Sequence, residues 1–348
     1  MQKIKAEIHL RSIYENATLF VRPTRKLCAV VKANAYGHGA EEVVNTLSGV
    51  ADCFAVALIE EALAIQTAAC GKDILIFTPP LTPTEVVTIA KNGWIATVPD
   101  LWTAKLIVQT MQTYGLPIRV HLKINTGMNR YGMHSELLGR VCRYLLHEKN
   151  VMVMGIYTHL YATDLEISQM QRQRFLRAVR IAKGYFPNVL AHIGGTYAAL
   201  LDDSYAFDMV RVGIGLYGYL PTDTLAKEFP LRKGMTVYAR TSAHRTYTYG
   251  GCGYGATSGR EMQRGDKISV CRFGYADGFF RKQENGADGG ENANTLCMDV
   301  CLRKNGKRRG EWIPILTDAE KTAKIAGTIP YEVLCAVTHR AEYVYKYD

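Results

Sequence analysis

One lysine of the chain lies where its side-chain amine could act as a nucleophile or as a base. The segment AVVKANAYGHG, residues 29–39, is an apolar strand that ends on Lys32, and small residues follow it and open the next helix. Apolar neighbours desolvate a lysine, which lowers its pKa and favours the neutral amine that covalent catalysis needs. Taken alone, this position fits better a structural lysine whose stem covers apolar surface at the end of a strand. The whole eleven-residue string is far more specific than the lysine alone.

Further segments place charged, hydroxyl-bearing and small residues directly after apolar runs. They read VHLKINTGMNRYG (120–132), GIYTHLYATD (155–164), HIGGTYAA (192–199), DMVRVGIGLYG (208–218), CGYGAT (252–257), GYADGFFR (274–281), LCMDV (296–300) and TIPYEVLC (328–335). A turn such as Gly213-Ile214 can offer backbone N–H groups to a phosphate. The guanidinium of Arg211 can only donate hydrogen bonds. These types of residue suit a site that holds an anionic ligand.

The elements that would position these residues alternate along the first two-thirds of the chain. Short β-branched runs predict strands at Leu27–Lys32, Cys53–Ala57, Ile74–Thr78, Trp94–Val98, Ile118–Ile124, Val151–Tyr157, Val189–Ile193 and Met209–Val212. The helices between them have readable ends, with caps expected at Thr82, Asp100 and Ser135 and stops at Gly71, Gly93 and Gly115. Eight strands with intervening helices predict an α/β fold, a (β/α)8 TIM-like barrel over residues 1–230 with its chemistry at the C-terminal ends of the strands.

The alternation of expected strands and helices ends at about residue 230. Strands are expected at Met235–Arg240, Lys267–Arg272, Trp312–Leu316 and Arg340–Tyr347, joined by Gly- and Asn-rich turns. Residues 231–348 are therefore expected to form a mainly β C-terminal domain. Residues 1–10 alternate polar and apolar side chains and are a candidate strand for pairing with that domain.

Composition and charge exclude several classes of protein. No stretch approaches the roughly 20 apolar residues that a membrane span needs, which predicts a cytoplasmic protein with no membrane contact in these residues. The nine cysteines form no CxxC pair and mostly sit in apolar runs, such as those around Cys53 and Cys335. Buried reduced thiols with no disulfide frame and no metal site are therefore expected. The net charge of +10 raises a nucleic-acid hypothesis, but the densest basic run, residues 303–309, contains no aromatic residue. We expect a solvated turn there, no nucleic-acid partner, and attraction of an anionic substrate.

Taken in order, the segments quoted above resemble the alanine racemase family. These are enzymes of fold type III that depend on pyridoxal 5'-phosphate (PLP), and they include the serine/alanine racemase domains of vancomycin resistance. The resemblance runs from about residue 5 to residue 345. It implies an isomerase that interconverts L- and D-alanine and supplies D-alanine for peptidoglycan. It also implies a head-to-tail homodimer, in which residues of the second domain complete the active site of the partner.

The resemblance assigns roles to individual residues. Lys32 and Tyr254 match the two catalytic bases, Lys32 acting on the D-enantiomer and Tyr254 on the L-enantiomer, and Lys32 also binds PLP covalently. The other implied contacts of the cofactor are Tyr36, Arg130, His159, Thr196, Arg211, Gly213, Ile214 and Tyr331, and the implied contacts of the substrate are Arg130, Met298 and Tyr331. Supporting roles fall to Lys123, as a carbamylated brace for Arg130, to Asp299, and to the entrance residues Asp164 and Arg281.

One implied contact has a mechanistic consequence. Arg211 matches an arginine that faces the pyridine nitrogen of PLP, where most PLP enzymes place a carboxylate. An arginine disfavours protonation of that nitrogen, which suppresses transamination and suits racemisation. The chain departs from the family pattern at Asn125, Gly195, Thr196 and Thr295, where Asp, Asn, Ser and an entrance Arg are usual.

Two other functions remain open at this point. A serine or mixed serine/alanine racemase would differ mainly at residue 331, where a residue smaller than Tyr331 makes room for a hydroxymethyl group. The discrimination is worth only about 1–3 kcal/mol. A non-catalytic, PLP-binding regulatory protein would need only the barrel. The presence of Tyr254, of the Met298-Asp299 pair and of a whole second domain argues against it.

Overall fold

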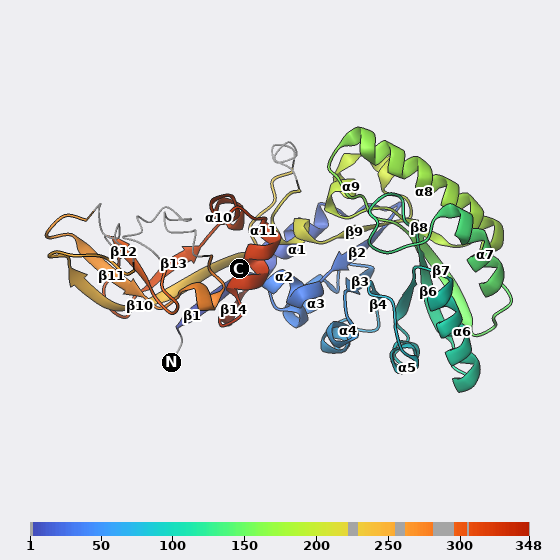
Figure 1. Ribbon diagram of the computed structural model, residues 1–348, viewed down its shortest axis with the longest axis horizontal. Coiled ribbons are helices and arrows are strands. Elements are labelled where there is room, and N and C mark those ends of the chain that lie inside the picture. Colours follow the sequence, from blue (N-terminus) through green and yellow to red (C-terminus); the bar gives the residue numbers. More distant parts are fainter. Residues whose placement is uncertain (1–2, 222–228, 255–261, 281–295, 305, 348) are drawn as a thin grey trace.

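The computed structural model of the chain describes residues 3–221, 229–254, 262–280, 296–304 and 306–347. They form two parts arranged along the long axis of the molecule, a barrel and a smaller sheet (Figure 1). Both ends of the chain lie at the second part.

The larger part is a parallel barrel. Its strands are β2 (Lys26–Val30), β3 (Cys53–Val56), β4 (Asp73–Ile76), β5 (Ile95–Val98), β6 (Ile118–Lys123), β7 (Val151–Tyr157), β8 (Leu190–His192) and β9 (Met209–Val212), and they pair in the order β8-β7-β6-β5-β4-β3-β2-β9. Backbone bonds from Asp208 N to Ala191 O and from Arg211 N to Gly194 O join β8 to β9 and close the ring. The eight strands expected from the sequence are confirmed, each to within two residues at either end.

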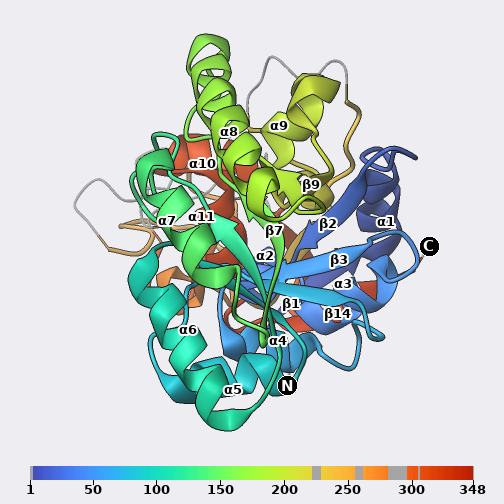
Figure 2. The same ribbon diagram turned by 90° about the vertical axis from the view of Figure 1, so that its right-hand side faces the viewer.

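Helices surround the strands of the barrel (Figure 2). They are α1 (Leu10–Thr18), α2 (Lys32–Gly37), α3 (Ala40–Leu47), α4 (Ile59–Ile65), α5 (Pro83–Lys91), α6 (Leu101–Tyr114), α7 (Ser135–Leu145), α8 (Leu165–Tyr185) and α9 (Thr196–Leu201), with 3-10 turns η1 (Asp203–Tyr205) and η2 (Ile214–Tyr217). The hydroxyl of Thr82 and the carboxylate of Asp100 cap α5 and α6 as expected, accepting from Glu85 N and Thr103 N. The cap expected at Ser135 is wrong by one residue, because Ser135 is already helical and His134 precedes the helix.

The second part is a mixed sheet. Its strands are β1 (Ile4–His9), β10 (Met235–Thr246), β11 (Lys267–Cys271), β12 (Cys301–Lys304), β13 (Trp312–Leu316) and β14 (Glu342–Lys346). The order is β12-β11-β10-β1-β14, with β13 also paired to β10. The N-terminal strand β1 is antiparallel to β10 and parallel to β14, so the first residues of the chain belong to this sheet. Helices α10 (Ala319–Ala326) and α11 (Pro330–Val337) and the 3-10 turn η4 (Tyr275–Asp277) were not expected, and α11 packs against α2.

Two local expectations are corrected by the second part. The basic run at residues 303–309 does not begin as a solvated turn, because Arg303 lies in β12 with its side chain buried beside the ring of Phe273. Strand alternation turns residues 301 and 303 to the same buried face. Cys335, expected to be buried, is exposed on α11. All nine cysteines are free thiols, as expected.

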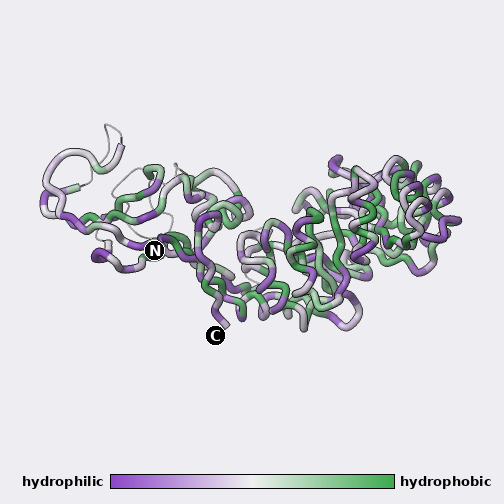
Figure 3. Tube along the Cα trace, turned by 90° about the horizontal axis from the view of Figure 1, so that it is seen from below, coloured by the Kyte–Doolittle hydropathy of each residue, from purple (hydrophilic) through white to green (hydrophobic). Residues whose placement is uncertain are grey.

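One core of buried apolar residues runs through the barrel and into the second part. Hydrophobic and hydrophilic stretches alternate along the chain (Figure 3). All four residues of β3 and of β9 are buried, as in parallel strands that are covered on both faces. No helix in the described part of the chain is long and apolar enough to cross a membrane.

Candidate active site at the mouth of the barrel

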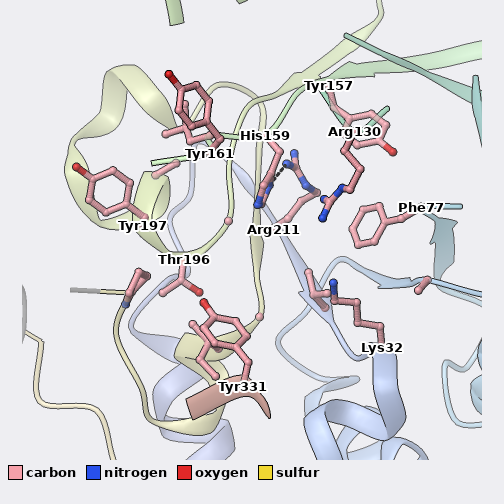
Figure 4. A pocket seen from close by; sticks show the side chains of 18 of the residues that line it. Lys32, Phe77, Arg130, Tyr157, His159, Tyr161, Thr196, Tyr197, Arg211 and Tyr331 are labelled. Carbon is pink, nitrogen blue, oxygen red and sulfur yellow. Dashed lines mark hydrogen bonds between the residues drawn. The ribbon is translucent and has the colours of Figure 1, made fainter. Parts of the chain in front are cut away.

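A pocket of about 690 Å³ lies where the barrel strands end, within the size range of small-molecule sites (Figure 4). Its cationic lining residues are Lys32, Lys123, Arg130 and Arg211. None of the described residues that line it is an aspartate or a glutamate. The charged guanidinium groups of Arg130 and Arg211, with no carboxylate among the described residues beside them, make the pocket attractive to anionic groups such as a phosphate and an amino-acid carboxylate.

The turn after Lys32 has an unusual backbone. Ala33, Asn34, Ala35 and Tyr36 all have φ between 51° and 54°, so the segment of small residues that leads into helix α3 is itself left-handed. Left-handed backbone costs about 1–2 kcal/mol per non-glycine residue and must be held by its surroundings. Glu61 Oε1 accepts from Ala33 N at 2.6 Å, and the Asn34 side chain accepts from Ala40 N at 2.8 Å.

This turn fixes the direction of the Lys32 amine, which points into the pocket (Figure 4). Burial, followed by the nearby positive charge of Arg130, lowers the pKa of Lys32 below its ordinary value. Both effects favour the neutral amine, the form that can bond covalently to an aldehyde or accept a proton.

A second group of pocket residues carries hydroxyls and a glycine turn. Tyr36, Thr196, Gly213 and Tyr331 lie together, with the rings of Tyr36 and Tyr331 5.9 Å apart between centroids. A Cβ at Gly213 would lie 2.5 Å from the Tyr36 hydroxyl, so only glycine lets this hydroxyl approach the turn after β9. Thr196 lies at the start of α9 and its hydroxyl accepts from Gly215 N at 3.1 Å. Converging hydroxyls around a glycine turn fit a phosphate group, so these residues fit the phosphate of PLP.

Arg211 forms the floor of the pocket. Its guanidinium donates to Thr158 O at 2.7 Å, and it lies 2.6 Å from His192 Nδ1 and 3.4 Å from His159 Nδ1. Burial lowers the pKa of Arg211 to about 10, which still leaves it charged at neutral pH. None of the ion pairs among the described residues includes it, so this buried cation is held by neutral acceptors alone.

Lys123 lies at the end of β6, with its ammonium 4.2 Å from the centre of the Tyr157 ring. Burial, together with the charges of Arg211 and Arg130, lowers the pKa of Lys123 well below its ordinary value. A neutral lysine amine can add carbon dioxide, which is the chemistry that a carbamylated brace requires.

The loop that carries Arg130 explains the departure at residue 125. The Asn125 Oδ1 accepts from Gly127 N at 3.0 Å and from Asn129 N at 3.1 Å, and its Nδ2 donates to Asn129 Oδ1 at 2.8 Å. An aspartate could accept the first two bonds but could not donate the third. Asn129 has φ 56°, a left-handed conformation that Asn tolerates. The asparagine at residue 125 therefore suits Asn129, because its side chain can both accept and donate the hydrogen bonds of this loop.

Several pocket residues were missed by reasoning from the sequence, among them Phe77, Tyr157, Tyr161 and Tyr197 (Figure 4). Tyr157 had a usable signal, because it lies two residues before His159 and alternate residues of a strand share a face. Gly195, the other departure, lies beside His159, where a Cβ would lie 3.4 Å from the imidazole ring.

The pocket brings together Lys32, Tyr36, Lys123, Arg130, His159, Thr196, Arg211, Gly213, Ile214 and Tyr331. Other expected site residues lie elsewhere. In the second part of the molecule Tyr254 is 71% exposed, Met298 is 53% exposed and Asp299 is also exposed. Asp164 is not among the lining residues and caps α8 by accepting from Ile167 N at 2.8 Å. Arg281 and Thr295 lie outside the described residues.

Comparison with known proteins gives the same family along the whole chain. The family models for the alanine racemase N-terminal and C-terminal domains match residues 8–221 and 234–345. Alanine racemases from Nostoc sp. and from Halalkalibacterium halodurans are 30% and 31% identical, over 97% and 98% of this chain and 95% of each relative. A solved alanine racemase from Clostridium difficile superposes with a TM-score of 0.89 at 27% identity, covering 100% of this chain and 97% of that one. The chain belongs to the alanine racemase family.

Proposed function

We propose that this protein is a PLP-dependent isomerase that interconverts L- and D-alanine. The observation that carries the proposal is the convergence of the desolvated Lys32 amine, the Arg211 guanidinium and a hydroxyl-lined glycine turn on one positively charged pocket. PLP, when bound, supplies an electron-withdrawing ring that acidifies the α-proton of an attached amino acid.

The residues of the pocket divide into those that hold the cofactor and those that tune it. Tyr36, Thr196, Tyr331 and the Gly213-Ile214 turn would hold the phosphate, and Lys32 the aldehyde carbon. Arg211 carries only donors and stays charged, so beside the ring nitrogen of bound PLP it would disfavour a proton there. This would favour return of a proton to the α-carbon of the substrate over transamination.

Racemisation needs a base on each face of the α-carbon. Lys32 is the base on one face, and its lowered pKa provides the neutral amine. For the other face we propose the partner subunit's Tyr254, in a head-to-tail homodimer. Two facts support this proposal: Tyr254 is largely exposed in its own chain, and it does not line the pocket of its own chain.

Substrate recognition follows from the same pocket. Arg130 would bind the substrate carboxylate, helped by the backbone N–H of the partner subunit's Met298, with Asp299 beside it. Tyr331 narrows the pocket and favours the methyl group of alanine over the hydroxymethyl group of serine. Asp164 and Arg281 are proposed as residues of the entrance.

We also propose that Lys123 is carbamylated, since its buried neutral amine lies among cations and a carbamate would supply the anion that pairs with Arg130. Protein equilibrated with ¹³C-bicarbonate should show a carbamate resonance that is absent from Lys123→Gln. A spectrum without that resonance would show that Lys123 is not carbamylated.

The nine free thiols support a reducing compartment, and we place the reaction in the cytoplasm.

Chiral analysis of the purified protein with PLP and each L-amino acid in turn tests the proposal. D-Alanine should form fastest, D-serine more slowly. Retained PLP with no racemisation of any amino acid would indicate a binding protein instead. A preference for serine would correct the substrate.

A further inference from the structure

Behind the floor of the pocket lies a pair of buried histidines that do not line it. His121, on β6, is 5% exposed, and His192, on β8, is fully buried. His192 Nε2 lies 3.0 Å from His121 Nδ1, and His192 Nδ1 lies 2.6 Å from Arg211 Nη1. The three side chains thus form one chain of contacts, Arg211–His192–His121, across the interior of the barrel.

Arg211 determines which nitrogen of each of the two histidines carries the proton. A guanidinium has donors only, so the 2.6 Å contact is a hydrogen bond only if His192 Nδ1 accepts. In a neutral imidazole the proton of His192 then lies on Nε2, which donates to His121 Nδ1. His121 must in turn carry its own proton on Nε2.

Both rings are locked in place by packing. A Cβ at Gly155 would lie 2.6 Å from three atoms of the His121 ring, so that ring lies directly against the backbone of β7. The Tyr157 ring stacks on His192 at 4.9 Å between centroids and an interplanar angle of 6°. Neither imidazole can turn to exchange its two nitrogens without moving a strand or a tyrosine.

Both imidazoles are also held neutral. Burial, aided by the charge of Arg211, lowers the pKa of His121 to about 3 and that of His192 well below its ordinary value. If His192 lost its acceptor at Nε2, the alternative tautomer would aim an N–H at the Arg211 guanidinium. The 2.6 Å bond would be lost, and a buried cation would be left with one acceptor fewer.

We propose that His121 is a positioning residue that fixes the tautomer of His192 and thereby holds Arg211 in its orientation under the pocket. The assignment of the tautomers stands on the geometry alone. The consequence for catalysis rests on the proposed function, since it concerns the arginine that would face the ring of PLP.

Two substitutions of His121 separate its hydrogen bond from its bulk. His121→Phe keeps a flat ring and removes the acceptor. His121→Asn places an amide oxygen near the position of Nδ1, so it restores the acceptor with less bulk. Gly155→Ala leaves both histidines in the sequence but forces the His121 ring away from its place. His147→Phe, at an exposed position after α7, is the control.

The first readout is the histidine tautomer, from ¹H–¹⁵N spectra of the PLP-free protein labelled with ¹⁵N-histidine. The His192 signals are assigned by their loss in His192→Gln. The native protein and His121→Asn should show His192 protonated at Nε2, and His121→Phe and Gly155→Ala should not. A native His192 protonated at Nδ1 overturns the inference, whatever the activity.

The second readout is turnover of the PLP-loaded enzyme. In His121→Phe, kcat for alanine should fall about 10-fold with KM little changed, and the fraction of turnovers lost to transamination should rise. His121→Asn should recover to within about 3-fold of native. A kcat in His121→Phe equal to that of the control also overturns the inference. A native protein with the expected tautomers but no racemase activity would overturn the proposed function alone.

Discussion

The mouth of the barrel and the exposed face of the second domain carry their functional residues in opposite ways. At the barrel, Lys32, Lys123 and Arg211 converge on one pocket, and burial lowers the pKa of each. In the second domain, Tyr254 and Met298 present their side chains to solvent. On the proposed function, the barrel of one chain would hold the cofactor and supply one of the two bases. The second base would come from another copy of the chain.

Removal of the Lys32 amine should have the largest effect on racemisation. In Lys32→Ala, racemisation should fall by about 10³-fold or more, because both the covalent hold on PLP and one base are lost. Borohydride reduction should fix PLP to the native chain and not to the variant, as read by mass spectrometry. Lys91→Ala, at an exposed position on α5, is the control. Covalent PLP retained in Lys32→Ala would show that another lysine holds the cofactor.

Removal of the Tyr254 hydroxyl should slow racemisation and leave PLP binding unchanged. Tyr254→Phe should lower kcat by about 10²-fold to 10³-fold while PLP affinity stays within a factor of about two, because the residues proposed to hold PLP all lie in the barrel pocket. Stopped assays in both directions and PLP titration measure the two quantities. Tyr249→Phe, at the more exposed neighbouring tyrosine, should leave both unchanged. Equal rates in Tyr254→Phe and native protein would refute its role as a base.

The addition of one methyl group at Gly213 should weaken the binding of PLP through its phosphate. Gly213→Ala places a Cβ 2.5 Å from the Tyr36 hydroxyl, and relief of that clash must move the hydroxyl or the turn. We expect PLP affinity to fall about 10-fold, in line with the usual cost of overpacking. Gly139→Ala, on α7 with no atom within 4 Å of the new Cβ, should bind PLP normally. Normal affinity in Gly213→Ala would place the phosphate elsewhere.

The smallest effect concerns stability in acid. Burial lowers the pKa of His38 to about 4 and that of His121 to about 3, so both are neutral in the folded chain and protonated in the unfolded chain below about pH 6.5. The unfolded state then binds more protons, so the free energy of unfolding falls as the pH drops from about 6.5 towards 4. Each histidine contributes about 1.4 kcal/mol per pH unit there. Urea unfolding should give a shallower pH slope for His121→Asn than for native protein, with His147→Gln unchanged. Parallel slopes for His121→Asn and native protein would show that His121 does not contribute in this way.

The alternation of β-branched runs with capped helices was enough to predict the barrel, because buried parallel strands must be apolar on both faces. The left-handed turn after Lys32 could not be predicted in this way. Alanine has no preference for positive φ, and the conformation is held by Glu61, which lies on another helix. Strand β12 was missed because Arg303 and its basic neighbours suggest solvent, whereas Arg303 is buried beside Phe273.

Only some residues of the candidate site could be predicted from the sequence. The roles proposed for Lys32 and Arg211 come from motifs that resemble those of a family, and the structure brings both residues to one pocket. His121 and His192 lie within two of the quoted segments, residues 120–132 and 192–199, but no role was assigned to either. His121 lies two residues before the pocket residue Lys123 in β6, and His192 is the last residue of β8; these two positions are the signals that could have found them.

The sharing of sites between two chains is tested most directly by mixing two inactive variants, Lys32→Ala and Tyr254→Phe, unfolding them together and refolding them with PLP. Random pairing makes half of the dimers mixed, and each mixed dimer has one site with both bases. About a quarter of the native activity should therefore return. No return of activity, with mixed dimers demonstrated by mass spectrometry, would contradict a site built from Lys32 of one chain and Tyr254 of the other.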